Sequence, residues 1–136
     1  FGALGIIFLM IAKFECLKIL ADQTVFFLMA IVCSRWAQVA LSFYLPYAGE
    51  GGGLGEQVAR KIGLRELFGA SLFLLPFFFW TGSSGCFIFA GLVLFLFLLG
   101  FLFFKRIGGL TGDLLGAASE MTELFIFLSA LALFWK

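Results

Sequence analysis

Three carboxylate side chains toward the C-terminal end of the chain have the types and spacing that suit catalysis. Asp113, Glu120 and Glu123 stand among small and apolar residues. On an α-helix, which advances about 100° per residue, Glu120 falls roughly 20° from Asp113 and Glu123 roughly 80° from it, so the three share one face. Carboxylate oxygens suit hard divalent cations, and Mg²⁺ commonly binds a few carboxylates together with substrate phosphates. We therefore predict that these three residues are catalytic and bind Mg²⁺.

The depth of these acids argues for a function if their helix crosses a membrane. Glu120 and Glu123 lie about 10 and 15 Å beyond Asp113 along the helix axis. Each ionised side chain at membrane depth costs on the order of 3 kcal/mol. Two simpler interpretations remain open: the acids are solvated at headgroup level, with Asp113 capping the helix, or they neutralise Lys105 and Arg106. Because Asp113 and Glu120 are two turns apart, either two metals bind or other helices complete the shell, and this chain offers few other acids.

A second polar face is predicted in the first third of the chain. Arg35, Gln38 and Ser42 are spaced by three and four residues, so they share one side of a helix. Arg35 has no partner on its own helix, and a buried anion is its natural partner. That anion is either a carboxylate such as Glu120 or Glu123, in an interhelical salt bridge, or a substrate phosphate, which Arg binds bidentately. We predict that Arg35 binds substrate phosphate.

The first hydrophobic segment carries three charged residues, Lys13, Glu15 and Lys18. Glu15 and Lys18 can pair at i,i+3. Lys13 is then left without a partner, and we predict that it is a second phosphate-binding residue.

The composition shows what solvent surrounds these residues. Apolar residues make up 63% of the 136 and charged residues only 12%, and the mean hydropathy is +1.16. A soluble domain has about 25% charged residues, so this chain is an integral membrane protein with the lipid bilayer as its surroundings. The absence of His excludes His-based catalysis and His metal ligands, and a net charge of +1 gives no indication of nucleic-acid binding.

The hydrophobic pattern predicts an all-α integral membrane fold, a bundle of about five transmembrane helices. The third predicted span carries Pro76 and is short, so it could begin near Leu64 or bend. Residues 54–67 have the pattern of a short interfacial helix. The preceding glycines lack a following Gly-Lys-Ser/Thr and indicate a flexible hinge rather than a phosphate-binding loop. The predicted spans are residues 2–20, 24–47, 67–80, 86–104 and 111–135.

The basic residues predict how the bundle sits in the membrane. Residues 48–66, between the second and third spans, contain Arg60, Lys61 and Arg65, and the connection 105–110 contains Lys105 and Arg106. The other two connections contain neither Lys nor Arg. By the positive-inside rule the basic connections are cytoplasmic, with the N-terminus on the same side and Lys136 outside. The acidic cluster then begins at the cytoplasmic face.

Two motifs resemble a known family. The stretch 107–117, Ile-Gly-Gly-Leu-Thr-Gly-Asp-Leu-Leu-Gly-Ala, followed by Glu120 and Glu123, is similar to the C-terminal signature of the cobalamin synthase (adenosylcobinamide-GDP ribazoletransferase) family. Ser34-Arg35-Trp36, and Tyr47-Ala48 leading to residues 53–55, resemble its central motif. The resemblance runs over the whole chain, residues 1–136, which we expect to be a single transmembrane domain lacking the family's N-terminal, aspartate-rich part. That part would supply the missing carboxylates. Gly49 stands where the family usually has a basic residue.

The resemblance implies the last step of cobalamin assembly. α-Ribazole, or its 5′-phosphate, would attack adenosylcobinamide-GDP and release GMP with the help of Mg²⁺. Asp113, Glu120 and Glu123 would hold the metal, and Arg35 and Lys13 would face the phosphates. The protein would be a multi-pass protein of a bacterial or archaeal plasma (inner) membrane with its site toward the cytoplasm, and a homo-oligomer is possible.

Two other functions remain open at this stage. Intramembrane Arg35, Glu120 and Glu123 could form the ion relay of a coupled transporter, although the sequence shows no inverted repeat. The chain could also be an inactive membrane fragment that lacks half of an active site. Ion flux without nucleotide dependence would support the transporter, and an aspartate-rich upstream helix would support the enzyme.

Overall fold

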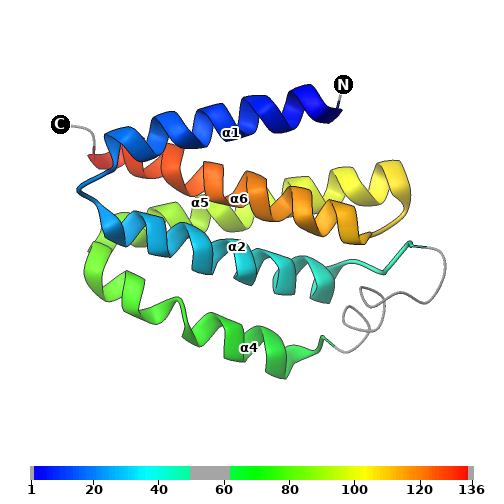
Figure 1. The fold of residues 1–136 in the computed structure, drawn as a ribbon. Helices are drawn as coiled ribbons and strands as arrows, with labels where there is room; N and C mark the ends of the chain where they lie inside the picture. Colours follow the sequence, from blue (N-terminus) through cyan, green and yellow to red (C-terminus); the bar gives the residue numbers. More distant parts are fainter. Residues whose placement is uncertain (1, 50–61, 135–136) are drawn as a thin grey trace.

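The computed structural model describes residues 2–49 and 62–134, and these residues are helical apart from short connections (Figure 1). The only pairing of extended backbone among them is an isolated bridge between Tyr47 and Leu110. The predicted all-α fold is therefore confirmed. The helices are α1 (Gly2–Ile19), α2 (Thr24–Tyr44), α4 (Leu64–Leu72), α5 (Leu75–Ile107) and α6 (Gly112–Phe134).

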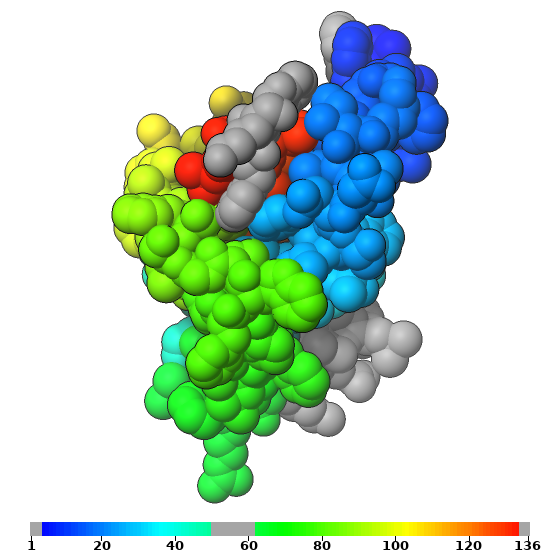
Figure 2. Space-filling view, turned by 90° about the vertical axis from the view of Figure 1, so that its left-hand side faces the viewer, coloured from blue at the N-terminus to red at the C-terminus, as the bar shows by residue number. Residues whose placement is uncertain are grey.

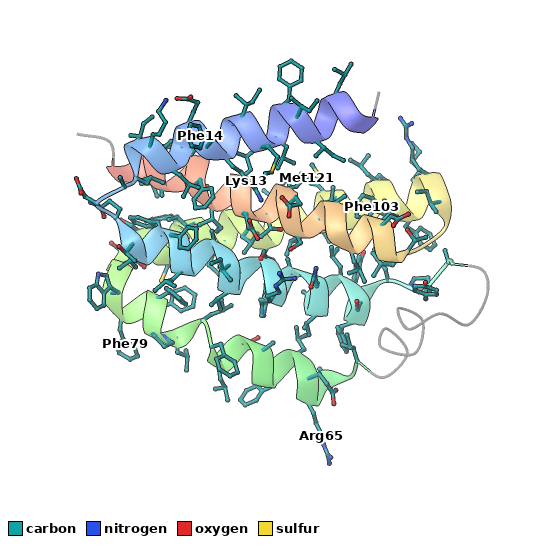
Figure 3. All side chains as sticks on the ribbon, in the orientation of Figure 1. Lys13, Phe14, Arg65, Phe79, Phe103 and Met121 are labelled. Atoms are coloured by element: carbon teal, nitrogen blue, oxygen red, sulfur yellow. The ribbon has the colours of Figure 1, made fainter. Side chains whose placement is uncertain are left out.

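Three of these helices, α2, α5 and α6, are long and apolar enough to cross a membrane. Their outward faces carry large apolar side chains that lipid would solvate, as the outer face of α1 does. Phe79 is 89% exposed and Phe8 73% exposed, and Figure 3 shows Phe79 at the outer surface of the bundle. α1 is 18 residues long but carries three charged side chains. Glu15 and Lys18 form the predicted i,i+3 pair, with 2.8 Å between Lys18 Nζ and Glu15 Oε2.

The third predicted span is bent rather than straight. α4 ends at Leu72, and α5 begins three residues later with Pro76 in its first turn, where the missing proline N–H costs no hydrogen bond. A sharper change of direction occurs at Gly82, whose φ of 58° and ψ of −137° are not helical. The chain turns back there, so the predicted connection 81–85 is a tight turn inside α5 (Figure 1).

The interfacial helix predicted for residues 54–67 does not run through its C-terminal half. Residues 54–61 lie outside the described part of the chain. Ile62 and Gly63 are not helical, and Gly63 is extended with φ −117° and ψ −171°. The Gly63 N–H donates to the Glu66 carboxylate at 2.7 Å, so a new helix starts at Leu64. Residues 64–67 therefore belong to α4.

Two predicted helix ends also move. α2 ends at Tyr44 instead of residue 47, because Pro46 keeps the preceding Leu45 extended, with φ −108° and ψ 141°. α5 continues to Ile107 and ends at Gly108, which has a φ of 82°. Of the three cysteines, Cys16 and Cys33 are buried and Cys86 is exposed.

α6 is the centre of the bundle and packs most extensively against α2, with α1 and α5 on its other sides. Fully buried alanines on both partners, such as Ala30 and Ala118, let the two backbones approach closely. On the far side of α2, Trp36 Nε1 donates to Ser71 Oγ of α4 at 2.9 Å. The Trp36 ring also lies 5.0 Å from the ring of Phe89 on α5, so one side chain joins three helices.

The connections gather at two ends of the bundle. At one end, the segment after α2 meets the segment before α6: Ala48 N–H donates to Leu110 O at 2.9 Å, and Leu110 N–H donates to Pro46 O at 2.8 Å. At the other end, Gln23 of the α1–α2 turn and Thr81 of α5 line one pocket, and Figure 2 shows these segments side by side. The second and fourth connections thus share one end, as their basic residues predicted.

Candidate functional site

The candidate site is centred on an ammonium group held by two carboxylates from another helix. Lys13 Nζ of α1 lies 2.6 Å from Glu120 Oε2 and 2.7 Å from Glu123 Oε2, both on α6. The Lys13 side chain is 11% exposed, while that of Glu123 is 21% and that of Glu120 is 50% exposed. Figure 3 shows Lys13 reaching from α1 toward α6. The prediction that Lys13 lacks a partner is therefore wrong.

A hydroxyl group from α2 completes this cluster. The Ser34 Oγ–H donates to Glu123 Oε1 at 3.1 Å, and the same Oγ lies 2.8 Å from Ile31 O. Ser34 is fully buried. Three helices therefore meet at Glu123, with α1 supplying the cation and α2 supplying the hydroxyl. The sequence motif contains Ser34 but does not indicate its contact with Glu123. The pairing of Lys13 could have been predicted, because an intramembrane lysine without a partner on its own helix requires an anion on another helix.

Arg35 does not join the cluster. On α2 it lies about 100° around the helix from Ser34, the residue that faces Glu123. Arg35 is exposed and, with Ile31 and Phe73, lines a groove between α2 and α4. No ion pair of Arg35 occurs within the described residues. The alternative of a salt bridge from Arg35 to Glu120 or Glu123 is therefore excluded, because Lys13 pairs with both carboxylates. The prediction that Arg35 binds phosphate stays a prediction.

Asp113 stands apart from the other two acids, in the first turn of α6. Its side chain is exposed, at the end of the bundle where the basic connections lie. Gly116 and Ala117, between Asp113 and Glu120, are exposed as well, and nothing lies within 4 Å of a Cβ added at Gly116. An uncovered strip of small residues therefore leads along α6 from Asp113 to Glu120.

The start of α6 is fixed by a close backbone contact. A Cβ added at Gly109 would lie 2.3 Å from Pro46 O and 3.0 Å from Ala48 Cβ, so only glycine fits there without a shift of backbone. Next to this contact are the two hydrogen bonds that join Leu110 to residues 46 and 48. The two motifs noted in the sequence, around Tyr47 and around Gly109, are thus in direct contact.

The chemistry of the carboxylate pair suits a hard cation. Glu120 and Glu123 each direct one oxygen at a single cationic nitrogen, and Mg²⁺ accepts such oxygens. Within residues 2–49 and 62–134, no three His, Cys, Asp or Glu side chains are placed to hold one metal ion. Glu120 and Glu123 could therefore bind one cation together, and Asp113 could bind only a second cation at a different position.

The family of the chain follows from comparison of its sequence with known proteins. The sequence profile of the cobalamin-5-phosphate synthase family matches residues 1–132. The chain belongs to this family. No solved structure matches it significantly.

Individual members of the cobalamin-5-phosphate synthase family are similar over nearly the whole chain. The proteins named adenosylcobinamide-GDP ribazoletransferase from Chlorobium phaeovibrioides and Chlorobaculum tepidum are 37% and 36% identical, over 96% and 99% of this chain. The protein of that name from Desulforamulus reducens is 36% identical over 92% of it. The matches cover 55%, 57% and 52% of these relatives, so the chain spans about half the length of the curated relatives it matches.

Proposed function

We propose that this chain forms part of a membrane-bound transferase of cobalamin biosynthesis, which joins adenosylcobinamide-GDP to α-ribazole or its 5′-phosphate and releases GMP. Family membership supports the pathway, and the relatives' names include adenosylcobinamide-GDP. The observation that carries the site is the pair Glu120 and Glu123 on α6, both held on one cation from α1. Mg²⁺ would be the metal and the cytoplasm the side from which both substrates arrive.

The reaction sets the task of each residue. A free ribose hydroxyl, present both in α-ribazole and in its 5′-phosphate, forms a new P–O bond to the phosphorus next to the corrinoid and gives up its proton, while the P–O bond to GMP breaks. Phosphoryl transfer depends mainly on positioning and on neutralising charge on the phosphate oxygens. A bound Mg²⁺ would supply part of that neutralisation, held by Glu120 and Glu123, with Asp113 at a second position. The Arg35 side chain is exposed and forms no ion pair among the described residues, so its guanidinium could bind phosphate in a bidentate way.

The test uses a chimaera in which this chain replaces the matched 55% of the Chlorobium phaeovibrioides relative. The chimaera is reconstituted in liposomes, and GMP release from adenosylcobinamide-GDP is measured with α-ribazole or its phosphate. Chelation of Mg²⁺ should stop GMP release, and added Mg²⁺ should restore it. Absence of GMP release under all conditions, together with ion flux that needs no nucleotide, would favour the transporter.

Variants of the chimaera test the residue roles. Asp113→Ala and Glu120→Ala should each lower kcat by about 100-fold or more, while Glu15→Ala, which breaks only an exposed pair on α1, should leave turnover unchanged. Normal turnover by either of the first two variants contradicts its role as a metal ligand. Arg35→Ala should raise the KM for adenosylcobinamide-GDP, and unchanged kinetics would remove Arg35 from the site.

A further inference from the structure

The Lys13 ammonium occupies the position between the two carboxylates that a metal ion would take. Its Nζ is within 2.7 Å of one oxygen from each of Glu120 and Glu123. Mg²⁺ binds oxygen at about 2.0–2.1 Å, so each oxygen would have to move inward by only about 0.6 Å to bind Mg²⁺ at the same point. The ammonium and a metal ion cannot be there together.

The charge of the cluster favours exchange with a divalent ion. One ammonium and two carboxylates leave one unit of negative charge among Lys13, Glu120 and Glu123. Replacing the ammonium with a divalent cation makes that site neutral, which a low-dielectric interior favours. The buried Ser34 hydroxyl adds a hydrogen bond to Glu123 but no charge.

Access to the site is open on one side. Half of the Glu120 side chain is exposed, and the strip formed by Gly116 and Ala117 leads to it from Asp113. A lysine has a flexible stem with four carbons, so its ammonium can leave the carboxylates without movement of α1. By contrast, the Glu123 side chain is mostly covered and held by Ser34, so it would stay in place.

We propose that Lys13 is a displaceable counter-ion: it holds Glu120 and Glu123 together without metal, and binding of a divalent cation expels its ammonium toward the phosphate substrate. This proposal rests on the proposed function and deepens it. In the paired state two of the three N–H donors of Lys13 point to the carboxylates, so at most one is left for a phosphate. Lys13 thus positions the two carboxylates before metal binds, and after displacement its ammonium can contact the substrate phosphate.

Chemical reactivity of the ammonium group tests the displacement without any variant. The chimaera in nanodiscs is acetylated with an amine-reactive ester, with and without Mg²⁺ and in the absence of substrate, and each lysine is quantified by mass spectrometry. Mg²⁺ should raise the acetylation rate of Lys13 by about tenfold, which corresponds to a tenfold increase in the ratio of released to paired ammonium. Lys18 on the same helix pairs with exposed Glu15 and serves as the internal control. Equal acetylation of Lys13 in both conditions overturns the proposal.

Metal affinity gives a second readout that does not depend on turnover. Binding of Mn²⁺ alone, measured by electron paramagnetic resonance, should become about tenfold tighter in Lys13→Met, because the competing cation is gone. Lys18→Met should bind Mn²⁺ like the unmodified chimaera. Unchanged or weaker binding by Lys13→Met overturns the displacement but leaves the proposed metal site intact. Failure of the unmodified chimaera to bind Mn²⁺ contradicts the metal site itself, and with it this proposal.

Discussion

At the residue scale, neighbouring side chains in one motif take different directions. Ser34 reaches Glu123 on α6, Arg35 faces the groove beside α4, and Trp36 donates to Ser71 on α4. A helix separates successive side chains by about 100°, so three consecutive residues cannot all face one site. The Ser-Arg-Trp sequence thus combines one residue for the carboxylate cluster, one candidate for the substrate and one for packing.

The buried hydroxyl group of Thr122 should lower the stability of the protein, because it forms no hydrogen bond among the described residues. Thr122, between Glu120 and Glu123 on α6, is fully buried, and its Oγ1 has no hydrogen-bond partner among the described residues. Because an unsatisfied buried hydroxyl costs about 1–3 kcal/mol, Thr122→Val should raise the free energy of unfolding by about 1 kcal/mol. Thermal unfolding in detergent micelles measures the change. The matched control is Thr81→Val, which removes the 2.6 Å hydrogen bond to Phe77 O and should destabilise the protein. A destabilised Thr122→Val would show that the hydroxyl has a partner.

At the element scale, α6 is positioned by the contact between the segment that precedes it and the segment that follows α2. Two backbone hydrogen bonds and the close approach of Gly109 to Pro46 fix the start of the helix. Lys13 fixes its middle through Glu120 and Glu123. The position of Asp113 relative to the carboxylate pair therefore depends on both contacts, although neither involves Asp113 itself.

The backbone contact can be broken by one methyl group. Gly109→Ala would place a Cβ 2.3 Å from Pro46 O, so the bridge must open, at a cost of about 1–3 kcal/mol. Hydrogen exchange of the Ala48 and Leu110 amides should speed up, because these amides form the bridge. Gly112→Ala, where nothing lies within 4 Å of the new Cβ, is the control and should leave both amides protected. Unchanged exchange in Gly109→Ala would show that the bridge does not depend on this contact.

The turn inside α5 depends on the conformation of a single residue. With φ at 58° and ψ at −137°, Gly82 occupies a region that other residues adopt at a cost of about 1–3 kcal/mol. Gly82→Ala should lower the free energy of unfolding by that amount, although no atom lies within 4 Å of the added Cβ. Gly69→Ala, in the helix α4 and equally free of neighbours, should stabilise by up to about 1 kcal/mol. Denaturant titrations of the two variants should therefore shift in opposite directions, and equal shifts would contradict this account.

At the scale of the whole molecule, the sequence predicted the helices better than it predicted their contacts. Apolar length and composition were enough to place most of the helices, and the basic residues correctly grouped the second and fourth connections at one end. The bend before Pro76 was foreseen as one option. Which charge would meet Glu120 and Glu123 could not be read from the sequence, because it depends on the rotation of α1 and α2 about their axes. On α2 the rotation directs Ser34 toward Glu123, whereas a rotation by one position would direct Arg35 there instead.

The orientation of the whole bundle in the membrane remains a prediction, and the fold makes it simple to test. The end of the bundle where α5 finishes should face the cytoplasm, because the last turn of α5 carries Lys105 and Arg106. The turn at Gly82 lies at the opposite end (Figure 1). In a background with Cys16, Cys33 and Cys86 replaced by Ala, Ser83→Cys and Arg106→Cys each introduce one thiol at an exposed position.

A membrane-impermeant maleimide added to spheroplasts should label Ser83→Cys in intact cells and Arg106→Cys only after the membrane is permeabilised. The positive charges of Lys105 and Arg106 favour the cytoplasmic side for this end of the bundle. The strip from Asp113 to Glu120 opens at the same end, and in the proposed reaction phosphorylated substrates and Mg²⁺ are supplied from the cytoplasm. Labelling of Arg106→Cys in intact cells would place the strip outside, on the side opposite to the one from which the proposed substrates arrive. That outcome would contradict the orientation and, with it, the proposed route of metal and substrate to Glu120.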